Sequence, residues 1–400
     1  MTLKTIIVLA MLVGVGPLLA AQRPDSTRDS TMLEQQARQI ARLDSQVTAL
    51  QREIRAQRTD SGRAVVAPVP AAATPPPIRI SGLLQTWYAQ GDGGFQSTFR
   101  IRRAELKFVG EPSRRTRWTI TFDAAKLLTT NNVTTVVNGS SVVTQTSVNQ
   151  SGRVLHDAFL SLTLPARIQL DVGQFKIPVG VEGGLQSSSA LETVERTMFA
   201  SDRGRGGIYG ESRDVGLLAR APAGRTVDYA LGVFNGVGEG QNDTDRNRQK
   251  AVVGRIGSKV PFLPQLSIGA SGAFSTKSTP DSLVRQRAGA DLRLVAGPVY
   301  LKGEFMSGRD GARRGEGWYT HVGYSPTTRL TLIARHDVFD PDRSRETAVA
   351  NARERDWIGG FTYDLPVMNV RLQMNYLRKY FPTAIASPRG LLLTNLQATW

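Results

Sequence analysis

Arginine and lysine are the residues of this sequence that are numerous enough, and suitably placed, to carry out a chemical role. That role is the binding of anions. The 400 residues include 50 Lys and Arg against 34 Asp and Glu, a formal net charge of +16. Most of the excess lies between Ile78 and Trp400. A planar guanidinium can hold two oxygens of one anion, so several converging arginines could discriminate between anions. The elements that carry these cations therefore decide what the cations can bind.

From Ile78 to Trp400 the chain reads as about sixteen short segments in which apolar and polar residues alternate. In one of them, Trp118, Ile120 and Phe122 alternate with polar residues. Period-two alternation predicts a β-strand with one apolar and one polar face, as in either a soluble sandwich or a membrane barrel. The alternation alone therefore predicts an all-β fold without choosing between the two.

The connections between these segments are alternately tight and long, and this alternation favours the membrane barrel over the soluble sandwich. After a strand predicted at Ile78 to Ala89 comes a Gly-rich loop, and after a second at Ser97 to Val109 comes a tight turn. Long loops at one rim and tight turns at the other are typical of a sixteen-stranded antiparallel transmembrane β-barrel of the outer membrane. Further long connections are expected at Lys126–Gly152, Ile177–Glu211, Gly236–Arg248, Thr276–Val284, Gly308–Gly315, Val338–Glu354 and Phe381–Arg389.

The third long connection, Ile177–Glu211, is the longest in the chain and concentrates charge. A loop of this length is expected to fold into the lumen and narrow it. Its acidic residues include Glu182, Glu192 and Glu195. The basic residues within it or at its two ends are Lys176, Arg196, Arg203, Arg205 and Arg213.

Arginine or lysine at the bilayer midplane costs about 2 to 4 kcal/mol, so basic residues on strands should face the lumen or the rims. A water-filled constriction lined by such residues attracts anions. For each individual residue, solvation at the rim or a salt bridge on the barrel wall is the competing interpretation. The set as a whole predicts an anion-preferring pore.

The N-terminus predicts export. Lys4 precedes an apolar run, Ile6 to Leu12, and residues 18–21 read Leu-Leu-Ala-Ala, so residues 1–21 are predicted to be a signal peptide. The competing interpretation is a membrane anchor, which the short apolar run disfavours. The sequence contains no cysteine, as is common in envelope proteins.

Residues 22–63 carry a heptad pattern. One core position is filled by Leu33, Ile40, Val47 and Ile54, and this pattern predicts a short periplasmic coiled coil, dimeric or trimeric. A solvated helix without a partner is the alternative. Residues 64–77 are rich in Pro and Ala and predict an extended linker to the barrel at 78–400.

Six stretches of Ile78–Trp400 together resemble the phosphate-selective porin O and P family in their order and spacing. They are FRIRRAELKFVG at Phe99–Gly110, DVGQFKIPVGVE at Asp171–Glu182, ERTMFASDRG at Glu195–Gly204, RDVG at Arg213–Gly216, YALGVFNGVG at Tyr229–Gly238 and GPVYLKGEFM at Gly297–Met306.

This resemblance implies a homotrimeric, sixteen-stranded channel for phosphate with a pore narrowed by its third loop. It also implies that Arg102 and Arg103 lie beside the anion path and that Asp123 is an acidic residue next to the basic cluster. Phe99 and Ile101 put odd positions outward whereas later residues reverse this, so a bulge is expected between them, and one arginine of the pair could then point away from the lumen. The third connection carries few lysines, unlike the phosphate-selective members, so the residues indicate anions in general.

Other classes of function find little support. His156, His321 and His336 each stand alone on strand segments, so no catalytic residue, cofactor or metal site is predicted. Nucleic acid is not an expected partner, because aromatic residues are not interleaved with the basic ones. An unselective diffusion porin and a coiled-coil envelope tether with an incidental pore remain as alternatives.

The last predicted strand, Leu391–Trp400, ends on an aromatic residue. This ending is similar to the signal read by the barrel-assembly machinery, which becomes an expected partner together with outer-membrane lipid. An accidental terminal Trp in an ordinary closing strand is the alternative.

Overall fold

The structure is a computed structural model that describes residues 78–92, 97–127, 134–137, 140–143, 154–201, 213–223, 226–236, 250–276, 284–348, 351–366 and 368–400. The predicted signal peptide, coiled coil and linker all lie outside the described residues. None of the helices that the structure describes is long and apolar enough to cross a membrane.

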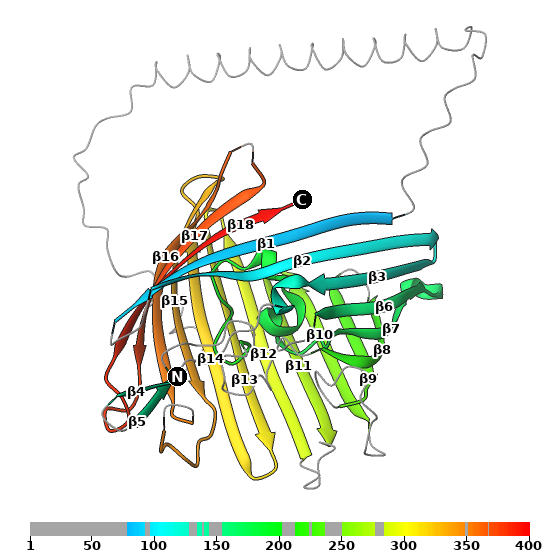
Figure 1. Cartoon of the computed structure of the whole chain (residues 1–400). Coiled ribbons are helices and arrows are strands. Elements are labelled where there is room, and N and C mark those ends of the chain that lie inside the picture. Colours follow the sequence, from blue (N-terminus) through cyan, green and yellow to red (C-terminus); the bar gives the residue numbers. More distant parts are fainter. Residues whose placement is uncertain are drawn as a thin grey trace, which may run out of the picture. The chain divides into compact units, whose positions relative to one another are not determined.

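Sixteen of the described strands form one closed antiparallel barrel, shown in Figure 1. Each strand pairs with its neighbours in the chain, apart from a small separate hairpin of β4 and β5, and β1 pairs with β18 to close the barrel. The predicted sixteen-stranded antiparallel barrel is therefore confirmed. Its strands are β1 Ile78–Gly91, β2 Thr98–Ser113, β3 Thr116–Asp123, β6 Leu155–Thr163, β7 Gln169–Lys176, β8 Arg213–Ala223, β9 Val227–Phe234, β10 Ala251–Val260, β11 Leu263–Thr276, β12 Val284–Ala296, β13 Val299–Asp310, β14 Arg313–Tyr324, β15 Leu330–Asp340, β16 Glu354–Asp364, β17 Val370–Tyr380 and β18 Arg389–Thr399.

The remaining described elements are short. The separate hairpin consists of β4 Thr134–Val137 and β5 Ser140–Val143. Four short helical turns complete the set, at η1 Ala124–Leu127, η2 Pro165–Arg167, η3 Gly180–Leu185 and η4 Ser188–Ala190.

The barrel closes through its two terminal strands. Leu83 lies opposite Thr399 in the β1–β18 register, and Gly82 and Trp400 exchange backbone hydrogen bonds of 3.0 and 3.3 Å. A Cβ at Gly82 would lie 2.0 Å from the Trp400 ring. The terminal indole thus packs directly on the backbone of β1, and only glycine leaves room for it there.

The burial of polar and apolar side chains on the two faces of the strands is the reverse of that in a soluble protein. On β17, Gln373 is 1% exposed, whereas on the outward face of β13 Phe305 is 44% exposed. The polar residues are buried because they point to the lumen, where they bond to one another and to a loop inside it. A closed barrel with an apolar outer surface and a polar interior is the arrangement that lets β-strands cross a bilayer.

The connections largely follow the predicted pattern. β7 ends at Lys176 and β8 begins at Arg213, so the third long connection agrees with the predicted Ile177–Glu211 to within one residue. The long connection predicted at Gly308–Gly315 is wrong, because β13 and β14 pair up to Asp310 and Arg313. Gly311 adopts a φ of 61° between them, which allows a two-residue hairpin turn where a longer loop was expected.

The predicted bulge in β2 is confirmed. Gln85 of β1 pairs with Arg103, and the next residue, Thr86, pairs with Ile101, so Arg102 is the extra residue. An extra residue in one strand turns neighbouring side chains toward the same face. Both Arg102 and Arg103 consequently face the lumen, and the expectation that one could point away is wrong.

Candidate functional site

The third loop, defined here as the connection from Ile177 to residue 212 and described as far as Ser201, lies inside the barrel. Its backbone N–H groups donate to inward side chains of distant strands: Gly180 to Ser271 at 3.0 Å, and Val194 to Asn375 at 2.7 Å. Gln397 of β18, the strand next to β17, donates to the carbonyl of Ser189 at 3.0 Å. The described part of the third loop is therefore bonded to inward side chains of β11, β17 and β18.

The strongest anchor is the carboxylate of Glu182, which is fully buried. It accepts hydrogen bonds from Lys302 at 2.9 Å and from Arg335 at 3.2 Å, and from the backbone N–H of Thr197 at 2.6 Å. Arg335, also fully buried, donates to Asp337 at 2.8 Å. The loop thus inserts one negative charge among two cations of the wall, and charge pairing compensates the cost of burying all of them.

A second anchor is Glu192. Lys302 donates to it at 2.7 Å and Arg293 at 2.9 Å, so Lys302 bridges the two loop carboxylates. Arg293 stacks over the Tyr300 ring at 4.7 Å and remains 45% exposed. Its guanidinium is therefore accessible to ions.

A third anchor lies at the β2 bulge. Arg102 donates to Glu195 at 3.1 Å and lies over the Trp87 ring at 5.3 Å. Arg103 lies 3.9 Å from Glu195 and donates to Gln85 at 2.7 Å. Two guanidiniums on the wall therefore share one carboxylate of the loop.

The other predicted basic residues occupy different surroundings. The buried Arg196 donates to loop oxygens, among them the Gln186 carbonyl at 3.0 Å. Lys176 donates to the same carbonyl at 3.5 Å, and Arg213 pairs with Asp157 at 2.8 Å. Arg203 and Arg205 lie outside the described residues. A role of these residues in binding anions stays a prediction.

Asp123 does not contact the arginine pair through its hydrogen bonds. Its Oδ1 accepts the backbone N–H groups of Ala104 at 2.9 Å and Ala125 at 3.2 Å. Its Oδ2 faces His156. The implied acidic neighbour of the basic cluster is thus an inward residue that is held by backbone donors.

Apolar contacts complete the seating of the third loop. Phe199 is buried against Tyr319, with ring centroids 6.3 Å apart, and lies directly over Gly317. Elsewhere, between loop residues such as Met198 and the strands β15 to β18, lies a cavity of about 20 Å³, which is room for a water molecule.

The loop carboxylates are held ionised. Burial alone would raise the pKa of Glu192, but the Lys302 ammonium and hydrogen bonds from Lys302, Gln186 and Arg293 lower it to about 2. Burial likewise opposes ionisation of Glu182, yet Arg335 and Lys302 place its pKa far below the usual range. Because both folded-state pKa values lie below the unfolded value of 4.5, their contribution to loop anchoring is complete above 4.5.

We expect the third loop to stay seated in acid. The anchoring contribution is lost only as the pH falls from 4.5 toward the folded-state pKa of about 2 for Glu192. Single-channel conductance measured in steps from pH 7 to pH 2 should therefore show an unchanged open level down to about pH 4. A change in the open level centred between pH 5 and pH 7 would contradict this assignment.

Lys302, Glu304 and Arg335 contact the third loop, and these contacts were not predicted from the sequence. Glu304 accepts the backbone N–H of Val181 at 2.8 Å. The missed residues share one feature: each belongs to a pair of charged residues two positions apart on a strand. Lys302 and Glu304 follow this spacing, as do Arg335 and Asp337, and the spacing could have marked them as inward.

A second group of arginines lies at the rim that carries the long loops. A cavity of about 360 Å³ there is lined by residues of β12, β13 and β14 and by Arg343 from the loop after β15. Arg309 and Arg314 are register partners on adjacent strands. The arginines of this cavity are Arg287, Arg309, Arg314 and Arg343.

Comparison with known proteins relates the chain to porins. The model of a family described as phosphate-selective porin O and P matches residues 84–261. The sequence matches none of the curated proteins.

Solved structures share the fold at low sequence identity. The outer membrane channel DcaP of Acinetobacter baumannii is 14% identical, with a TM-score of 0.54 over 81% of this chain and 97% of that chain. An anion-selective porin from Comamonas acidovorans is 10% identical, with a TM-score of 0.53 over 81% and 99%. The trimer form of OmpT from Vibrio cholerae is 8% identical, with a TM-score of 0.54 over 81% and 99%.

Proposed function

We propose that this chain, whose residues 84–261 match the model of the phosphate-selective porin O and P family, is an outer-membrane channel. Small anions, phosphate or polyphosphate among them, diffuse through its pore, which the third loop narrows. The observation that best supports a preference for anions is the arginine pair on β2. Arg102 and Arg103 both point into the barrel against the third loop and share the carboxylate of Glu195. Fixed positive charge at the narrowest part of a pore lowers the barrier for anions and raises it for cations.

Arginines at the rim support the same proposal. The arginine-lined cavity at the rim of the long loops would raise the local concentration of anions before they enter. Arg293, half-exposed beside the third loop, would offer a further guanidinium within the lumen.

An unselective diffusion porin is the second candidate, and one observation favours it. Lys302, Arg335 and Arg213 are each paired with a carboxylate, so much of the wall charge is neutralised locally. A pore in which the remaining charges cancel would pass anions and cations in proportion to their mobility.

Reversal potential in a KCl gradient across a planar bilayer separates the two candidates. An anion-selective pore gives a potential set by chloride, and phosphate titrated into chloride then reports whether phosphate blocks the current at low concentration. A current carried by anions without phosphate block would leave a general anion porin. A reversal potential near zero, or one set by potassium, would overturn the proposal.

We also propose a homotrimer and a periplasmic coiled coil at residues 22–63 joined to the barrel by the linker 64–77. Support for the trimer is the similarity to porins, of which the Vibrio cholerae OmpT has a trimer form. The mass of the protein in unheated detergent solution tests the trimer. Deletion of residues 22–77 tests the coiled coil, since a pure porin should keep its conductance and a tether should lose envelope integrity.

Deletion of Trp400 is expected to lower insertion into the outer membrane without changing the folded barrel. Trp400 ends the closing strand, and its exposed indole covers Gly82. The measurement is the amount of heat-modifiable barrel in outer-membrane fractions, compared with refolding of the purified variant in detergent. Unchanged insertion would contradict a role in recognition by the barrel-assembly machinery.

A further inference from the structure

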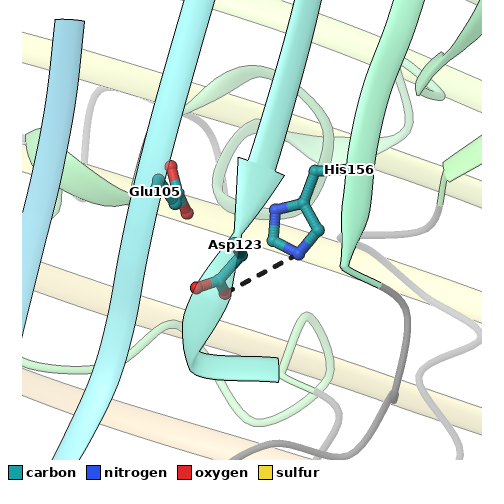
Figure 2. Close-up of side chains that lie close together, drawn as sticks. All are labelled: Glu105, Asp123 and His156. Atoms are coloured by element: carbon teal, nitrogen blue, oxygen red, sulfur yellow. Dashed lines mark ion pairs between the residues drawn. The ribbon is translucent and has the colours of Figure 1, made fainter. Parts of the chain in front are cut away.

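Glu105, Asp123 and His156 meet on the inner face of the barrel, although they come from three strands, β2, β3 and β6 (Figure 2). Each offers one ligand atom, and these atoms all lie within 4.8 Å of one another. His156 was expected from the sequence to stand alone, and this expectation is wrong. Two carboxylates and an imidazole placed this close together could bind a metal ion.

Strand register and a bulge bring Glu105, Asp123 and His156 together. Glu105 and Asp123 are direct register partners on β2 and β3. On β6, Asp157 pairs with Thr121 and Leu155 with Phe122, so His156 is the extra residue of a bulge.

Without the bulge, period-two alternation would turn His156 outward with Leu160. Instead, Gln174 donates to the carbonyls of Leu155 at 3.0 Å and His156 at 2.7 Å and holds the bulge in place. Bulges next to functional sites commonly re-aim a side chain in this way.

One carboxylate oxygen of the cluster lacks a hydrogen-bond partner among the described residues. Asp123 is fully buried, and its Oδ2 has no hydrogen-bond partner among the residues that the structure describes. Glu105 lies directly opposite it, and like charges in register on one face repel. Arg103 lies 3.8 Å from Glu105, beyond hydrogen-bond distance, and the charges of Arg103, Arg213 and Lys176 all act on the Glu105 carboxylate.

The separations fit ligands of one metal ion. Asp123 Oδ2 and His156 Nε2 are 3.7 Å apart, too far for a hydrogen bond. Two ligands that each lie about 2.1 Å from a tetrahedral ion are separated by about 3.4 Å. A small closure of the two side chains around an ion would therefore satisfy the orphaned carboxylate oxygen.

We propose that Glu105, Asp123 and His156 bind a divalent first-row transition metal ion, with Zn²⁺ as the best fit. One imidazole nitrogen and two carboxylate oxygens suit Zn²⁺ and leave a position for water from the lumen. Ca²⁺ and Mg²⁺ prefer oxygen ligands in six-fold or higher coordination, which a site with an imidazole serves poorly. The proposal concerns metal binding alone and stands whether or not the pore selects anions.

Titration of Zn²⁺ into the full-length protein in detergent, measured by isothermal calorimetry at pH 7, tests this. The protein must carry no affinity histidines. We expect one saturable site per chain, and loss of that binding in His156→Gln and in Asp123→Asn, which keeps an Oδ1 acceptor for the backbone donors. His336→Gln is the matched control, because His336 stacks on Trp357 at a centroid distance of 4.1 Å, away from the cluster.

Anomalous diffraction at the zinc edge on crystals of the unmodified protein keeps the test independent of how the variants fold. A peak between the three side chains supports the proposal. The proposal is overturned if no such peak and no saturable heat are found, in which case His156 and Asp123 form an ion pair without metal. Equal Zn²⁺ binding by His156→Gln and the unmodified protein would also overturn it.

Discussion

Glu182→Gln is expected to raise the single-channel conductance and make it unsteady, because the third loop then loses its strongest anchor. The substitution keeps the size of the side chain but leaves Lys302 and Arg335, both buried, with one negative partner fewer. Breaking a buried ion pair typically costs about 3 to 5 kcal/mol, which exceeds the contribution of any single neutral hydrogen bond of the loop. Conductance in planar bilayers and protease sensitivity of the loop in the folded barrel are the two measurements.

Glu316→Gln is the matched control for this variant. Glu316 pairs with Arg343 at 3.2 Å, and the arginine is 59% exposed. A surface pair of this kind contributes about 0 to 1 kcal/mol, so the open level should not change. If Glu182→Gln and Glu316→Gln give the same conductance as the unmodified protein, the apolar contacts of Phe199 and the remaining hydrogen bonds hold the loop unaided.

Replacement of both Arg102 and Arg103 by Gln is expected to lower the preference for anions, roughly several-fold in the permeability ratio. The double substitution removes two positive charges beside the third loop and leaves Glu195 without either of these two partners. Both changes act in the same direction, because the remaining carboxylate attracts cations. The reversal potential in a KCl gradient should therefore move toward the potassium value.

Two comparisons sharpen this prediction. Replacement of both residues by Lys keeps the charge and should keep the preference for anions, but it should weaken any block by phosphate, since the planar two-pronged guanidinium is lost. Arg378→Gln removes a positive charge that pairs with Asp92 at 3.1 Å, away from the third loop, and should leave selectivity unchanged. An unchanged reversal potential in the double Gln variant would refute the assignment of the pair to the anion path.

Local sequence patterns predicted much of the barrel, and there is a physical reason for this. A barrel strand must alternate between lipid and lumen, so the period-two pattern around Phe122 and Gln373 gave the direction of each side chain correctly. The reversal of that pattern within Phe99–Phe108 predicted a bulge there, and the strand register places it at Arg102. The hairpin at Gly311 was missed because glycine permits either a tight turn or a longer loop, and only the pairing of the two strands chooses between them.

The sequence by itself determined that the chain is a sixteen-stranded barrel with an excess of basic residues and a long third loop, because period, loop length and charge are local properties. Which charges meet was decided by the tertiary structure alone. Glu182 and Arg335 are far apart in the chain, and only closure of the barrel brings the loop to β15. Likewise, His156 joins Glu105 and Asp123 because strand register and a bulge align three strands, and register is a property of the paired sheet.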